Sequence, residues 1–292
     1  MKTIKLINFQ GINCYYNSIA TLVYDLGLDY KLLFGDLWSE CDLFFDEKSG
    51  LYSSKRLIAN LAACGAKILP LWEKDTQRAL NHLKAGESAV VCFDAFNVFW
   101  NSTYRLRHGT HYFIVRKSLT GEFLIFDPTL NKTDIKTSTN ELAGLCIDIF
   151  AVKKRRPDQA LKEELLCVKK EAVRAEKSVS TLKVKLVEGV ASLQGGEACI
   201  KFAKYCDALT NNRFMFRHFV FDLLHPDPKL FMPDSYLLSF VAVKNGLFKL
   251  SLTQDVRTKK QISHLLSVLL ENELKYALFS NQRTVLCRKR IF

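Results

Sequence analysis

The chain has 292 residues, of which 48% are hydrophobic and 25% are charged, and its formal net charge is +12. A chain of this length and balance buries a real core and forms one large domain or two modest ones. No apolar window approaches the length of a membrane span and the N-terminus lacks the pattern of a signal peptide, so we expect a cytoplasmic protein that does not associate with membranes.

The nine cysteines are scattered singly, without a CxxC pair or a zinc-ligand spacing with histidine. This pattern predicts reduced thiols, no disulfide framework and no metal site.

The basic excess lies entirely in the second half. Residues 1–150 hold 16 Lys+Arg and 16 Asp+Glu, whereas residues 151–292 hold 26 and 14, hence 26 − 14 = +12. Such asymmetry favours an acidic partner, although a solvated basic surface with no partner explains it about equally well. Nucleic acid is not expected, because the basic residues are dispersed among aliphatic helices and form no known recognition motif.

In chain order, the first half begins with helices and continues with strands. The elements expected before the sheet are a strand over 2–8, helices over 14–26, 53–64 and 76–84, and a strand over 66–71. Buried strands follow at 88–94, 111–116, 121–128 and 146–152, and the link 117–121 makes the middle two a hairpin. This order predicts an α+β fold.

Cys14 is the first candidate for chemistry. It lies where a loop becomes a helix, and the unpaired N–H groups of a helix N-terminus stabilise a thiolate and a developing oxyanion. A buried structural cysteine is the simpler explanation for a single thiol, so the functional hypothesis needs a base elsewhere in the chain.

His111 and Asp127 supply that base. His111 opens one strand of the hairpin and Asp127 closes the other, so antiparallel pairing brings both side chains to the same end of the sheet. We expect Asp127 to accept the Nδ1 proton and to leave Nε2 facing the nucleophile. Each residue alone has a structural explanation, as a strand-ending turn or a half-buried histidine, but the order of all three is far less expected by chance.

The segments around these residues, Gly-Thr-His111-Tyr-Phe-Ile-Val and Phe-Leu-Ile-Phe-Asp127-Pro, together with the cysteine at a helix start, resemble papain-like peptidases, particularly the double-glycine leader peptidases of bacteriocin exporters. The whole chain is more similar to the butirosin-biosynthesis acyltransferase family. That resemblance implies a papain-like domain over 1–152 and a helical, basic domain over 153–292. It also implies transfer of an acyl group from the phosphopantetheine thioester of an acidic acyl or peptidyl carrier protein to an amine or hydroxyl in natural-product biosynthesis, with no other cofactor.

The resemblance implies Cys14 as nucleophile, His111 as general base and then acid, and Asp127 as the orienting carboxylate. Papain-like enzymes place an oxyanion-hole glutamine six residues before the cysteine, where this chain has Asn8, while Gln10 lies four residues before it. Either amide can act beside the backbone N–H of Cys14. The sequence Asn-Cys14-Tyr replaces the Asp-Cys-Gly typical of the leader peptidases, which favours the acyltransferase branch.

Two other functions remain open. If water resolves the acyl-enzyme, the same site belongs to a cysteine hydrolase or peptidase. Alternatively, the chain is a non-enzymatic binding protein that retains the fold and binds a partner through its basic second half, residues 151–292.

Overall fold

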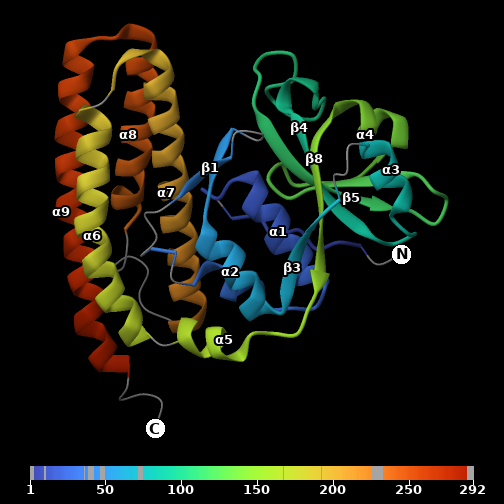
Figure 1. Cartoon of the computed structure of the whole chain (residues 1–292), viewed down its shortest axis with the longest axis horizontal. Coiled ribbons are helices and arrows are strands. Elements are labelled where there is room, and N and C mark those ends of the chain that lie inside the picture. The colour runs from blue at the N-terminus through green and yellow to red at the C-terminus, as the bar shows by residue number, and fades with distance from the viewer. Residues whose placement is uncertain are drawn as a thin grey trace. The chain divides into compact units, whose positions relative to one another are not determined.

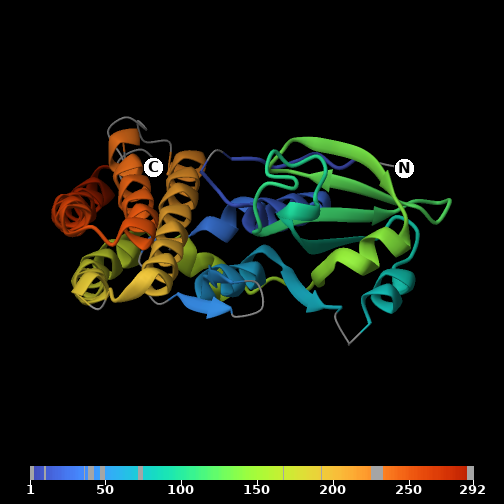
Figure 2. The same cartoon turned by 90° about the horizontal axis from the view of Figure 1, so that it is seen from above.

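The structure is a computed structural model of the whole chain. It describes residues 3–9, 11–35, 37–38, 43–46, 50–71, 75–166, 168–191, 193–224 and 233–287. Figures 1 and 2 show these residues from two directions. Helices combine with antiparallel sheets and the C-terminal part is helical, which confirms the α+β class.

The chain divides into two compact units. The first consists of Met1–Leu33, Asp46–Gly50 and Ile58–Gln159, and the second of Phe34–Phe45, Leu51–Leu57 and Ala160–Phe292. The expected boundary at 152/153 falls inside strand β8, which continues to Lys154 as part of the first unit's sheet. Much of the segment between 34 and 57 belongs with the C-terminal helices, which sequence order alone does not indicate.

A six-stranded sheet forms the centre of the first unit, with the strand order β3-β8-β4-β5-β6-β7 and every neighbouring pair antiparallel. Its strands are β3 (Ala66–Pro70), β4 (Ser88–Asp94), β5 (Thr110–Lys117), β6 (Phe123–Asp127), β7 (Lys132–Thr137) and β8 (Cys146–Lys154). The expected β5–β6 hairpin and the strands at 66–71, 88–94 and 146–152 are confirmed. β7 was not expected, because it is a polar edge strand with a single apolar residue.

The strand expected over 2–8 is wrong. Residues 3–9 adopt no regular structure. The backbone N–H of Ile7 donates to the hydroxyl of Thr21 at 2.9 Å, so this segment is fastened by a side chain of the following helix.

Helices cover both faces of the sheet. On one face, α3 (Thr76–His82) and α4 (Thr139–Leu145) contribute Leu80 and Leu142 to a core with alternate residues of the central strands, such as Val91 and Phe113. On the other, α1 (Cys14–Asp25) packs against β5, β4 and β8. Successive side chains of a strand point to opposite faces of the sheet. Because helices bury both faces here, the strands need apolar residues at consecutive positions, which explains their continuous apolar runs.

Five further short elements lie among the described residues between 30 and 97. They are the 3₁₀ helices η1 (Tyr30–Phe34) and η2 (Ala95–Asn97), the paired strands β1 (Phe44–Asp46) and β2 (Leu51–Ser53), and helix α2 (Lys55–Cys64). The Ser54 hydroxyl accepts from the N–H of Leu57 at 2.9 Å and caps α2. Gly65 ends α2 with φ +79°, a conformation that favours glycine.

The second unit is a helical bundle. Its helices are α5 (Gln159–Leu165), α6 (Val168–Ala191), α7 (Gly195–Leu224), α8 (Asp234–Thr253) and α9 (Val256–Cys287). Figure 1 shows α6 to α9 running side by side, with α8 between α7 and α9 and α6 against α9. None of the described helices is both long and apolar enough to cross a membrane.

A buried polar cluster ties residue 38 into this bundle. The Glu273 carboxylate accepts from Arg213 Nε at 2.8 Å and Nη2 at 3.2 Å, from Trp38 Nε1 at 2.7 Å, and from the Tyr236 hydroxyl. Burial, and then the charge of Glu273, raise the pKa of Tyr236, so its hydroxyl keeps the proton that it donates. The Glu273 carboxylate therefore neutralises the buried Arg213 guanidinium, and its oxygens also accept hydrogen bonds from Trp38 and Tyr236.

Candidate active site

Cys14 is the first residue of α1, as the sequence predicts, and three local features fix it there. Gly11 adopts φ +85°, which lets the chain turn into the helix. The Asn13 side chain accepts from the N–H of Tyr16 at 3.1 Å and caps the helix. Asn17 donates to the carbonyl of Ile12 at 3.1 Å and accepts from the N–H of Phe9 at 3.4 Å, so it braces the loop before the cysteine.

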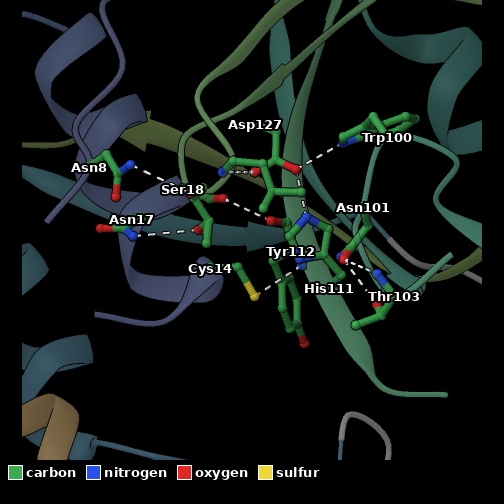
Figure 3. A network of polar contacts seen from close by, with 12 residues as sticks. Asn8, Cys14, Asn17, Ser18, Trp100, Asn101, Thr103, His111, Tyr112 and Asp127 are labelled. Carbon is green, nitrogen blue, oxygen red and sulfur yellow. Dashed lines mark hydrogen bonds and ion pairs between the residues drawn. The ribbon is translucent and has the colours of Figure 1, made fainter. Parts of the chain in front are cut away.

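His111 and Asp127 are in direct contact, as Figure 3 shows, with His111 Nε2 2.6 Å from Asp127 Oδ2. A carboxylate accepts only, so the ring nitrogen is the donor. The expectation that Asp127 binds Nδ1 is therefore wrong. Strand register explains it: pairing stops at Ile114–Phe126, and its continuation places Asp127 opposite Phe113, two residues from His111. Residues in such diagonal positions lie roughly 7 Å apart, and Nε2, the ring nitrogen farther from the backbone, reaches across this distance to Asp127.

Asp127 is fully buried and has two further donors. Trp100 Nε1 donates to Oδ2 at 2.9 Å and the N–H of Leu130 donates to Oδ1 at 3.1 Å. The carboxylate therefore accepts three hydrogen bonds that fix its plane. Sequence reasoning missed Trp100, because it lies in an aperiodic segment 27 residues from Asp127.

The sulfur of Cys14 lies beside His111 and accepts from the backbone N–H of Tyr112 at 3.3 Å (Figure 3). Burial alone would lower the pKa of His111, but hydrogen bonds to Asp127 and then to Cys14, with the charges of both groups, raise that pKa to about 10. With Nε2 bound to Asp127, Nδ1 is the nitrogen left for the sulfur. At neutral pH the His111 imidazolium, held by Asp127, and the backbone N–H of Tyr112 therefore lie around the sulfur of Cys14.

Of the two candidates for the oxyanion hole, Asn8 and Gln10, the structure describes only Asn8. Asn8 is exposed and its amide donates to the carbonyl of Thr129 at 3.5 Å. Figure 3 shows Asn8 apart from Cys14 and His111. Gln10 lies outside the described residues. The choice of oxyanion amide stays a prediction.

Within the described part of the chain, no three histidine, cysteine, aspartate or glutamate side chains gather in a group that could hold a metal ion. Cys14, His111 and Asp127 lie in sequence of contact, and a thiol, an imidazole and a carboxylate arranged in this way can serve as nucleophile, proton carrier and orienting group. No protein-family model matches the chain, and no curated protein matches it significantly.

Proposed function

We propose that the protein is an acyltransferase that moves an acyl group from a carrier-protein thioester to an amine or hydroxyl acceptor through Cys14. The observation that carries the proposal is the continuous set of contacts from Cys14 through His111 to Asp127. The choice of acyl transfer within cysteine chemistry rests on the resemblance to the butirosin-biosynthesis family.

In the first half-reaction, the Cys14 sulfur attacks the thioester carbonyl and a carbon–sulfur bond forms. The resulting oxyanion is stabilised by backbone N–H groups at the start of α1 and by the amide of Gln10 or Asn8. The bond to the pantetheine sulfur then breaks, and His111 gives that sulfur its Nδ1 proton. The product is an acyl-Cys14 thioester with a neutral imidazole beside it.

In the second half-reaction, the acceptor attacks the acyl-Cys14 carbonyl while His111 takes its proton through Nδ1. The carbon–sulfur bond breaks and returns the thiolate–imidazolium pair. Asp127 holds the ring through Nε2 in both steps, so the same nitrogen serves as acid and then as base. Water in place of the acceptor makes the reaction a hydrolysis.

Intact-protein mass spectrometry after incubation with an acyl carrier thioester, without acceptor, tests this proposal. We expect an acyl adduct that maps to Cys14 and is absent from Cys14→Ala, while Cys146→Ala, which removes a thiol at the edge of the core, retains it. Addition of an amine acceptor then releases an amide. Free acid formed equally fast with and without acceptors supports the hydrolase alternative, and an adduct that survives in Cys14→Ala contradicts catalysis by Cys14.

A further inference from the structure

The segment Ala95–Gly109, here called the 95–109 loop, connects β4 to β5 and exposes large apolar side chains. Phe99 is 62% exposed and Leu106 is 80% exposed. Arg105 and Arg107 on either side of Leu106 are also exposed. The loop sequence contains no aspartate or glutamate, so its surface is apolar and positive.

The 95–109 loop is joined to the catalytic residues at two points. Its Trp100 donates to the carboxylate of Asp127, and its C-terminal end leads through Thr110 directly to His111. Figure 3 shows the hydrogen bond from Trp100 to Asp127, the carboxylate that also contacts His111. A partner that binds the loop therefore stands beside the site that contains Cys14.

Internal contacts hold the 95–109 loop in a defined shape. At its base, Asp94 accepts from the N–H groups of Phe96 and Gly109 at 3.1 and 3.0 Å and from His108 Nδ1 at 2.6 Å. The rings of Phe96 and His108 stack with centroids 4.5 Å apart. Arg105 has φ +54°, rare for a residue with a side chain, and its N–H donates to the carbonyl of Phe96 at 3.0 Å.

Exposure alone does not single out this loop. Leu119, in the β5–β6 hairpin turn, is 81% exposed, as much as Leu106. However, Leu119 follows the C-terminal end of β5, whereas His111 lies at its N-terminal end. At about 3.3 Å per residue, the strand separates the two ends by roughly 20 Å. Leu119 is therefore a control for an exposed leucine that is distant from the site.

We propose that the 95–109 loop is the docking surface for the acidic carrier protein, with Phe99 and Leu106 in apolar contact and Arg105 and Arg107 facing its carboxylates. This inference rests on the proposed function and adds the place at which the donor binds. It differs from the expectation, drawn from the basic excess of residues 151–292, that an acidic partner binds the second half of the chain. Acidic groups on a partner complement the loop, and charge complementarity beside apolar anchors sets both orientation and encounter rate.

The test uses a probe that does not depend on the identity of the acyl group. A carrier protein whose pantetheine arm ends in a bromoacetamide alkylates Cys14, because the sulfur displaces bromide and forms a thioether. The same bromoacetamide-terminated pantetheine without the carrier, here called the free pantetheine probe, measures the reactivity of the thiol alone. The ratio of the two second-order rate constants reports docking.

We expect Arg105→Glu/Arg107→Glu to lower this ratio on the order of tenfold at low salt, and less at high salt, because exposed charges are screened. The matched control Lys183→Glu/Lys260→Glu makes the same charge change at exposed positions of the helical bundle. Leu106→Ser lowers the ratio and Leu119→Ser does not. The rate with the free pantetheine probe stays unchanged in all four variants.

Two failures are distinguishable. If the wild-type ratio exceeds one and the bundle variants lower it while the loop variants do not, docking is on the C-terminal unit and the inference is wrong, although the proposed function stands. If the carrier-bound probe gives wild-type Cys14 no advantage over the free pantetheine probe, a carrier-protein donor is itself contradicted.

Discussion

Replacement of Asp127 by asparagine probes how the carboxylate controls His111. Oδ2 accepts from His111 and Trp100, while Oδ1 accepts from the N–H of Leu130. An amide has one oxygen and one NH₂ group, so either orientation sets a donor against a donor. Asp127→Asn therefore removes the charge and also breaks at least one hydrogen bond in a buried site.

The size of the effect of Asp127→Asn can be worked from the pKa of His111, which is raised from 6.5 to about 10. Because the pKa in the folded protein is raised, the stabilisation is fully present below pH 6.5 and is lost as the pH rises through about 10. The net shift corresponds to about 5 kcal/mol of folding free energy, which remains after the favourable effects of Asp127 and Cys14 have offset the cost of burial. We expect Asp127→Asn to lower the pKa of His111 by at least about one pH unit, a differential of about 1.4 kcal/mol.

The pH dependence of Cys14 alkylation by iodoacetamide measures this change without a natural substrate. The wild type should keep its imidazolium beside the sulfur up to about pH 10, so the upper inflection of the rate profile should move to lower pH in Asp127→Asn. Urea denaturation between pH 6.5 and 10 should show a shallower loss of stability in the variant. Asp134→Asn, at an exposed position on β7, is the charge-matched control. An unchanged upper inflection would refute the role assigned to Asp127.

The remaining predictions concern single donors and the buried pair of the bundle. Trp100→Phe keeps an aromatic ring but removes the donor to Asp127. Urea denaturation should show that the free energy of unfolding falls by about 1.5–3 kcal/mol, as for hydrogen bonds to charged groups. Equal stability of variant and wild type would mean that this hydrogen bond contributes nothing. Glu273→Gln leaves the buried Arg213 without its countercharge and should cost about 3–5 kcal/mol, whereas Glu271→Gln at an exposed position of the same helix should change stability by less than about 0.5 kcal/mol. Comparable losses in both variants would contradict the importance of the buried pair.

The sequence predicts the parts of this fold whose side chains repeat with a regular period. Continuous apolar runs identify β4, β5 and β6, and hairpin geometry then brings Asp127 to His111. The ring nitrogen is not predictable in this way, because it depends on a register offset of two residues that strand ends do not reveal. Trp100 escapes prediction for a related reason, since its segment has no period and its partner lies across the fold.

The polar edge strand and the division into units have a different physical origin. β7 has a single apolar residue, Ile135, which packs against the core opposite Ile125, and one such residue leaves no periodic pattern in the sequence. Trp38 belongs to the helical unit because its indole donates to Glu273, 235 residues later. Contacts of such sequence separation depend on the folded arrangement and not on local propensity.

In the proposed function, the 95–109 loop would keep partner recognition separate from catalysis but adjacent to it. Trp100 and Thr110 are constrained, one by the carboxylate of Asp127 and the other by its place in β5 before His111. The side chains of Leu106 and Arg107 between them are exposed and take part in neither contact. Substitutions there can change the partner without disturbing the Cys14 surroundings, provided that Asp94 continues to hold the loop at its base. A variant that loses docking but keeps the reactivity of its thiol is therefore the expected behaviour of this arrangement.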